Sequence, residues 1–145
     1  MIKIVSGNIL KDNNSQAITN PVNCVGVMGA GLALQFKKQY PNNFKEYKLA
    51  CNLNKVKLGK MFITRLEYNR YIINFPTKYH WKENSKIEYI NTGLENLLFQ
   101  LNDLNIKSIA IPKLGCGLGG LDWNDVKQSI IDIFHNTEID VIIYE

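Results

Sequence analysis

Three segments of this 145-residue chain have residue types and spacings that could bind a phosphorylated ligand and react with it. Two of them are rich in glycine, and the third holds a lysine, a histidine and two aromatic residues at positions 78–81. Glycine lets backbone amides approach a phosphate closely, and the N-terminus of a following helix favours negative charge. A lysine beside such an anion site could act as a nucleophile or as a cation that orients a substrate.

The first glycine-rich segment, residues 20–32, leads directly into a predicted helix. It has neither the Gly-Lys-Ser/Thr of a Walker A loop nor a strict GxGxxG pattern, so a structural turn is an equal alternative to a phosphate site. Asn23 lies just after the preceding predicted strand. Its amide could satisfy backbone groups of the loop, which is the usual role of Asn in turns, or it could hydrogen-bond a ribose hydroxyl.

The second glycine-rich segment, residues 111–123, has four glycines between positions 115 and 120 and again lies between a predicted strand and a helix. Two such loops predict the two walls of one diphosphate site. Asp122 is placed to cap the last helix, which we favour over a catalytic role. Cys116 has no histidine beside it in the sequence, so we expect a packing residue rather than a nucleophile.

The third segment, residues 73–82, contains the candidate reactive side chains. Lys78 could be an ordinary solvated lysine or, if partly desolvated beside the anion site, an amine with a lowered pKa. His80 could act as an acid or base, although a structural role is favoured. Tyr79 and Trp81 offer faces on which a nucleobase could stack, and Lys82 and Lys86 follow them. The alternation of basic and aromatic residues fits either a nucleic-acid contact or an amphipathic loop.

A sheet with alternating helices must position these segments. Short β-branched runs predict strands at residues 2–5, 16–20, 60–66, 71–75, 108–111 and 140–144, and apolar periodicity predicts helices at 31–40, 43–52, 86–104 and 123–135. This alternation is typical of a largely parallel sheet covered by helices, and a hairpin around residues 68–70 makes the sheet mixed. In such folds ligands bind outside the carboxyl ends of the strands, where all three segments begin.

Composition narrows the class of protein. A chain of this length forms one α/β domain, residues 1–145, and no run is apolar enough to span a membrane. The N-terminus has no signal-peptide pattern, and the three distant cysteines form no disulfide framework, so we expect a cytoplasmic location. Neither the cysteines nor the two histidines have metal-ligand spacing, so we expect no metal. The net charge of +4 is compatible with a polyanionic partner.

The three segments, in this order, resemble the macrodomain family, and the resemblance covers essentially the whole chain. The matching stretches are residues 7–10, 23–37, 74–78 with Trp81, and 115–123. Within the family, the chain is similar to the branch that contains terminal ADP-ribose protein glycohydrolase and the antitoxin macrodomains of the DarT–DarG system. The resemblance implies a three-layer α/β/α fold with a mixed, mostly parallel six-stranded sheet, and ADP-ribose as ligand or product with no separate cofactor.

The same resemblance implies a role for each matching residue. Lys78 would be the catalytic lysine, acting on the anomeric carbon covalently or electrostatically, and Asn23 would contact the distal ribose. Residues 7–9 would flank the adenine, and the two glycine loops would wrap the diphosphate and distal ribose. The residues assigned to ADP-ribose are Gly7, Asn8, Ile9, Gly29, Ala30, Gly31, Leu32, Thr77, Gly115, Cys116, Gly117, Leu118 and Gly119, and those assigned to nucleic acid are Tyr79, His80 and Trp81.

Two departures from the family pattern bear on the substrate. The protein-directed glycohydrolase has an aspartate where this chain has Gly119, which favours the DNA-directed antitoxin branch. Many binding macrodomains have an aspartate where this chain has Asn8. The antitoxin carries a further C-terminal domain, so the chain is expected to be either an excised domain or a stand-alone hydrolase.

The leading expectation is therefore an ADP-ribosyl glycohydrolase that removes ADP-ribose from thymidine bases in single-stranded DNA. We expect a monomer that does not associate with membranes and that reverses the modification made by a DarT-like transferase toxin. The alternatives are a glycohydrolase acting on ADP-ribosylated acidic side chains or on O-acetyl-ADP-ribose, a non-catalytic ADP-ribose reader, and an unspecified nucleotide-binding α/β domain.

Overall fold

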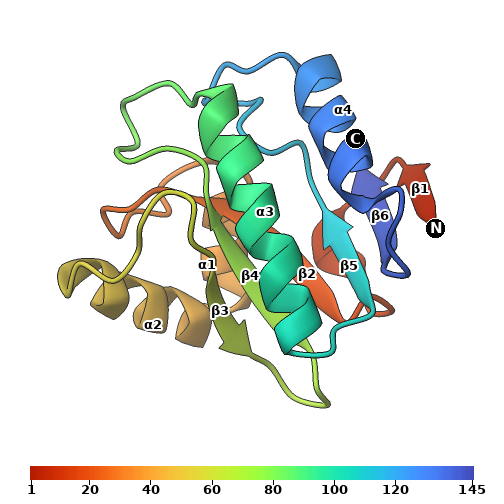
Figure 1. Cartoon of the computed structure of the whole chain (residues 1–145). Helices are drawn as coiled ribbons and strands as arrows, with labels where there is room; N and C mark the ends of the chain where they lie inside the picture. Colours follow the sequence, from red (N-terminus) through yellow and green to blue (C-terminus); the bar gives the residue numbers. More distant parts are fainter.

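Six strands form one sheet in the order β1-β6-β5-β2-β4-β3, with helices on both of its faces (Figure 1). The computed structural model describes residues 1–145 without a gap. All neighbouring strands are parallel except β3 and β4, so the predicted mixed, mostly parallel sheet is confirmed. The elements are β1 (Ile2–Val5), the short 3-10 helix η1 (Ile9–Lys11), β2 (Ala17–Val22), α1 (Gly31–Gln39), α2 (Pro41–Asn52), β3 (Phe62–Arg65), β4 (Tyr71–Pro76), α3 (Ile87–Asp103), β5 (Ser108–Ile111), α4 (Trp123–Phe134) and β6 (Asp140–Tyr144).

The boundaries differ from the predicted ones by a few residues. β2 continues through Pro21 to Val22, whereas the predicted strand ended at residue 20. β5 pairs with β2 only at Ala17 and Ile18. Pro21, which has no N–H to donate, therefore interrupts no hydrogen bond to β5. α2 begins at Pro41 rather than at residue 43, since proline is well suited to the first helical position. The short helix η1 was not predicted.

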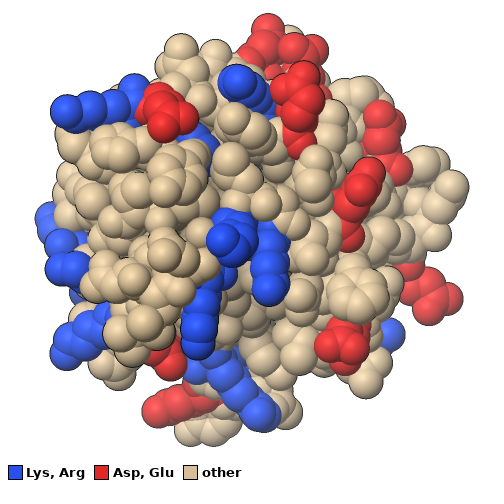
Figure 2. All heavy atoms as spheres, turned by 60° about the vertical axis from the view of Figure 1, so that its left-hand side comes forward, with Lys and Arg blue, Asp and Glu red and all other residues tan.

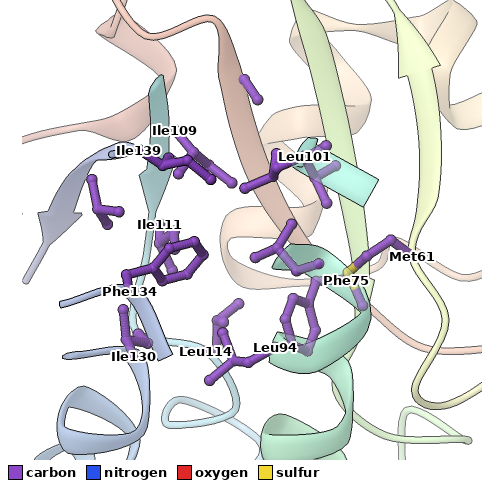
Figure 3. Packing of buried hydrophobic residues seen from close by; sticks show 14 of the residues in the cluster. Met61, Phe75, Leu94, Leu101, Ile109, Ile111, Leu114, Ile130, Phe134 and Ile139 are labelled. Atoms are coloured by element: carbon purple, nitrogen blue, oxygen red, sulfur yellow. The ribbon is translucent and has the colours of Figure 1, made fainter. Parts of the chain in front are cut away.

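Helices α3 and α4 cover one face of the sheet through a continuous apolar core. Eighteen buried residues form this cluster, and Figure 3 shows side chains from both helices meeting those of β4 and β5 between the layers. The predicted apolar stripe of α3 is confirmed, with Ile90, Leu94, Leu97 and Leu101 all buried. Asp122 caps α4 as predicted, because its carboxylate accepts a hydrogen bond from the Asn124 backbone N–H at 2.8 Å.

The opposite face, beneath α1 and α2, is divided. One apolar cluster of six buried residues lies around Phe36, and a second of seven lies around Tyr47. Between β2, β4, β3 and α2 lies a buried polar network. Asn20 donates to Asn74 at 3.1 Å, Asn74 and Asn43 exchange hydrogen bonds at 2.8 and 3.1 Å, and Thr64 donates to Asn43 at 2.7 Å. This face therefore combines apolar packing with buried amides.

A cleft follows from the chain path at the centre of the sheet. β2 leads toward α1 on one face, whereas its neighbour β5 leads toward α4 on the other (Figure 1). Connections that depart to opposite faces leave a crevice outside the carboxyl ends of the two strands, which is where ligands bind in such sheets. No helix is both long and apolar enough to cross a membrane.

Candidate functional site

A cavity of about 1000 Å³ lies at the carboxyl ends of β2, β4 and β5, between the two glycine-rich loops. Fifteen residues predicted for catalysis or ADP-ribose binding line this one cavity, although they come from four separate parts of the sequence. They are Gly7, Asn8, Ile9, Asn23, Gly29, Ala30, Gly31, Leu32, Thr77, Lys78, Gly115, Cys116, Gly117, Leu118 and Gly119.

Lys78 reaches this cavity from the segment that follows β4. The residue is only 9% exposed, and burial lowers the pKa of its ammonium group, with the nearby Glu83 opposing the shift. Burial lowers a lysine pKa because a charged group loses solvation more than a neutral amine does. The backbone around it is fixed, since Thr77 N–H donates to Val22 O at 2.9 Å and Cys24 N–H donates to Tyr79 O at 2.8 Å. Of the two alternatives that the sequence left open for Lys78, the structure therefore supports the partly desolvated amine rather than the solvated surface lysine.

The Asn23 side chain forms most of its hydrogen bonds with the backbone of its own loop. Its Oδ1 accepts from Val25 N–H at 3.0 Å, from Val27 N–H at 3.4 Å and from the Tyr47 hydroxyl at 2.8 Å. Its Nδ2 donates to Val27 O at 2.7 Å, which leaves one N–H for a ligand. The geometry supports the loop-organising alternative for Asn23 and leaves a single hydrogen bond for the predicted ribose contact.

The second glycine loop has positions that strongly favour glycine, among them Gly115 and Gly119. Gly115 has a φ of +72°, a left-handed conformation that other residues adopt at a cost. At Gly119, a Cβ atom would collide with the carbonyl oxygen of Gly115 and lie 2.9 Å from its carbonyl carbon. An aspartate at this position would therefore require the loop to take another path.

Ser85 ties this loop to the Lys78 segment, and sequence reasoning missed it. Its backbone N–H donates to Gly119 O at 2.9 Å, while its hydroxyl donates to Thr77 O. The side chain is buried beneath both segments. A lone serine in a polar stretch carries no sequence signal of such a role.

Cys116 has the packing environment predicted for it. The thiol donates to Leu114 O at 3.3 Å, and burial raises its pKa, with Lys113 opposing and Asp122 adding to the shift. A raised pKa keeps the thiol protonated and weakens it as a nucleophile. Leu118, at the tip of the same loop, is 74% exposed beside the cavity.

Of the three residues predicted to contact nucleic acid, only Trp81 lines the cavity. The His80 ring stacks on Trp81 with ring centroids 5.3 Å apart, and Lys82 Nζ lies 5.1 Å from the Trp81 ring centroid. Tyr79 lies outside the cavity, with 54% of its surface exposed. His80 also lies outside it, because its ring is turned toward Trp81 and the Lys82 backbone N–H.

The end of the cavity near residues 7–9 is completed by the last residue of β6 and by Glu145. Tyr144 lies there, and its hydroxyl donates to the carboxylate of Asp12 at 2.9 Å. Trp123 donates to Glu145 at 3.0 Å beside it. The rule that ligands lie at the carboxyl ends of strands could have found Tyr144, because it ends β6. The cavity-lining residues that sequence reasoning missed are Pro21, Val22, Val27, Ala33, Gln35, Pro112, Lys113, Leu121, Trp123, Tyr144 and Glu145.

The charged side chains of the cavity lining are two lysines and one carboxylate. The Glu145 carboxylate accepts a hydrogen bond from Trp123 at 3.0 Å and forms an ion pair with Lys127 at 3.1 Å. No three histidine, cysteine, aspartate or glutamate side chains gather closely enough to hold a metal ion. The glycine amides and the start of α1 suit the phosphates of an anionic nucleotide. The Lys78 amine suits a reactive carbon of the same ligand.

A sequence model of the Macro domain matches residues 19–130 of this chain. The protein named DNA ADP-ribosyl glycohydrolase from Mycobacterium tuberculosis is 47% identical over 148 residues, which span 99% of this chain and 42% of that protein. The chain thus spans about two fifths of the length of these curated relatives.

Solved structures of related proteins share the fold at high similarity. The macrodomain of Mycobacterium tuberculosis DarG superposes with a TM-score of 0.96 at 47% identity, covering 99% of this chain and 97% of that one. Thermosipho africanus DarTG, solved in complex with ADP-ribose, gives 0.93 at 35% identity, covering 99% of this chain and 41% of that one. With both predicted glycine loops at the carboxyl ends of the strands, the chain belongs to the macrodomain family and groups within it with the DarG macrodomains.

Proposed function

We propose that this protein is a DNA ADP-ribosyl glycohydrolase, which removes ADP-ribose from thymidine bases in single-stranded DNA. The observation that carries the proposal is Lys78, a buried lysine whose pKa is lowered, in a cleft between two glycine loops. The names of its relatives, DNA ADP-ribosyl glycohydrolases at 44–47% identity, support DNA as the substrate class.

The reaction replaces the bond between the anomeric carbon of the distal ribose and the base nitrogen with a bond to water oxygen. In the route that the lowered pKa favours, the neutral Lys78 amine bonds to the anomeric carbon after the ribose ring opens. The base leaves with its bonding electron pair and takes up a proton. Water then adds to this carbon, the Lys78 amine leaves, and the ring oxygen bonds to the carbon again to close the ribose, so ADP-ribose and unmodified DNA are the products. In the alternative route, the Lys78 ammonium only orients the ribose and stabilises charge.

Gly119 supports DNA over protein as the carrier of ADP-ribose. The related protein-directed enzyme resembled by this chain has an aspartate at the matching position, and here the backbone of Gly115 fills the space of any side chain. A hydrolase without that carboxylate relies on other groups for acid–base chemistry. Release from acidic side chains or from O-acetyl-ADP-ribose is therefore the less favoured activity.

The proposed partner is a DarT-like transferase that attaches the ADP-ribose removed here. A Thermosipho africanus relative, 35% identical, is named as a fusion of a DNA ADP-ribosyl transferase with a DNA ADP-ribosyl glycohydrolase. A physical link between the two activities in that protein supports a functional link here. In this proposal both activities act in the cytoplasm.

The decisive experiment measures ADP-ribose release from a thymidine-modified oligonucleotide, with ADP-ribosylated protein and O-acetyl-ADP-ribose in parallel. Lys78→Ala is expected to lose about a thousandfold in kcat while still binding ADP-ribose in calorimetry. Lys113→Ala, which removes the other lysine of the cleft, is expected to lose less than about tenfold. Full activity in Lys78→Ala would refute the assignment of the lysine, and faster release from protein than from DNA would refute the substrate class.

The pH dependence separates the two routes. If the neutral amine attacks, kcat rises with pH and levels off above a Lys78 pKa that lies below the ordinary lysine range. If the ammonium acts electrostatically, kcat falls over the same range. Tight ADP-ribose binding with no turnover of any linkage would instead identify a reader.

A further inference from the structure

The positive charge of this chain is concentrated in one part of it. Residues 31–60 hold seven lysines and one glutamate, a net charge of +6, whereas the remainder holds ten basic and twelve acidic residues, a net charge of −2. This stretch forms α1, α2 and the loop before β3. In Figure 2, which brings the α2 side of the molecule forward, lysine and arginine side chains lie down the centre and along the left edge of this face, while acidic side chains lie mainly to the right and at the top.

The lysines of α2 and its following loop are available for a ligand. The five of them, Lys45, Lys48, Lys55, Lys57 and Lys60, are all exposed, and none forms an ion pair. By contrast, the lysines expected from the sequence to contact DNA lie against neighbouring rings, Lys82 against Trp81 and Lys86 against Tyr89, 5.1 and 5.8 Å from the ring centroids.

Residues beside the reactive end of the cleft also lie near this face. Lys78 is followed by the exposed Tyr79, whose carbonyl accepts from Cys24 N–H at 2.8 Å. Lys57 lies close enough to Cys24 to counter the rise in pKa that burial gives its thiol. At the next turn, the Lys48 side chain packs against Gly26, 3.5 Å from where a Cβ would stand. The acidic groups nearby are Glu83, close to Lys78 and Cys24, and Glu46 on α2.

We propose that the face formed by α2 and residues 53–60 is the track on which the phosphate backbone of the single-stranded DNA lies as it leaves the cleft past Tyr79. This inference rests on the proposed function and adds the direction of the strand and the surface that holds it. Proteins that bind single strands combine a basic groove for phosphates with aromatic side chains for bases. Tyr79 would supply the stacking face and Lys48, Lys55 and Lys57 the phosphate contacts.

The test compares a short and a long substrate. The probes are ADP-ribosylated thymidine mononucleotide and an ADP-ribosylated single strand of about 16 nucleotides. In Lys48→Gln/Lys55→Gln/Lys57→Gln, the ratio of kcat/KM for the long substrate to that for the mononucleotide is expected to fall about tenfold at low salt. The slope of log kcat/KM against log salt for the long substrate is expected to become shallower by about 2, since each phosphate contact contributes about 0.7.

The matched control, Lys3→Gln/Lys11→Gln/Lys107→Gln, removes three exposed lysines elsewhere and is expected to keep both the ratio and the salt slope. If wild-type protein releases ADP-ribose from neither substrate, the proposed function fails. If it releases ADP-ribose from both and the α2 variant keeps the wild-type ratio and slope, the track is refuted and the basic face serves another partner, such as an acidic protein. If the control variant changes as much as the α2 variant, net charge rather than this face holds the DNA, and the track is again refuted.

Discussion

The two faces of the sheet differ in how they are built and in what they hold. Beneath α3 and α4, 18 buried apolar residues form one uninterrupted core. Beneath α1 and α2, two smaller apolar clusters flank buried amides from three elements. The second face also carries the loop that follows β2, which forms one wall of the cleft.

The difference indicates a division of labour within one domain. An apolar core stabilises the fold in proportion to the apolar area removed from water. Because this effect is non-directional, it does little to fix the orientation of the packed segments. Buried amides add little net stability, but they penalise every arrangement that leaves a donor or acceptor unpaired. The α3–α4 face therefore contributes most of the stability, while the α1–α2 face fixes the orientation of the loop that forms the site.

The largest expected effect is on the apolar face. Phe134→Ala is expected to lower the free energy of unfolding by about 3–5 kcal/mol in denaturant titration, because it leaves a large cavity in the main core. The folded fraction is expected to bind ADP-ribose as the wild type does. Phe36→Ala, on α1 beneath the cleft, is expected also to weaken ADP-ribose binding. Equal binding in both variants would contradict the division of labour.

The next effect tests the amide network. Asn74→Leu leaves Asn20 and Asn43 without their shared partner and is expected to cost about 2–3 kcal/mol, again measured with denaturant. Asn91→Leu, an exposed position on α3, serves as the control and is expected to change stability by less than about 0.5 kcal/mol. If Asn74→Leu proved as stable as the wild type, the network would not constrain this face.

A smaller effect is expected where the second face meets the site. The buried Tyr47 hydroxyl donates to the Asn23 carbonyl and side chain, both at 2.8 Å. Tyr47→Phe is expected to cost about 1–2 kcal/mol in stability and to raise the calorimetric Kd for ADP-ribose several-fold, since the loop loses an anchor. Tyr68→Phe, at a position 93% exposed, is the control. A Kd that stayed at the wild-type value would show that the loop holds its shape without Tyr47.

The smallest expected effect concerns acid stability at the other end of the cleft. Burial opposes ionisation of Asp12, but hydrogen bonds from Ser15, Tyr144 and Asn14 outweigh it and lower the pKa of the carboxyl. A carboxyl with a lowered pKa stabilises the folded state above its unfolded value of about 3.9, and this contribution is lost as pH falls through the folded value.

Thermal melts from pH 6 down to about pH 3 measure this contribution. Asp12→Asn is expected to lose less stability on acidification than the wild type, with a difference below about 1 kcal/mol because burial offsets part of what the hydrogen bonds contribute. Asp140→Asn, which removes an exposed pair with the N-terminus, is the control. Parallel acid curves for the wild type and Asp12→Asn would show that the cluster does not stabilise the fold.

Much of the fold and of the candidate site was predictable from local pattern. Local pattern predicted the apolar stripe of α3, the alternation of strands and helices, and the hairpin before β4, because apolar periodicity and turn chemistry act over a few residues. The glycine loops and Lys78 were found for the same reason. Tyr144, Trp123 and Ser85 were missed, since their roles arise from contacts between distant parts of the chain.

The sequence by itself determined which elements form, which loops are rich in glycine, and that a lysine follows a buried strand. Tertiary structure alone decided how these features are used. The divergence of β2 and β5 opened the cleft, and packing desolvated Lys78 and turned the Asn23 amide into its own loop. Folding also left the five lysines of α2 and its following loop exposed and without an ion pair. Burial and pairing depend on atoms brought together across the whole chain, so local spacing cannot specify them.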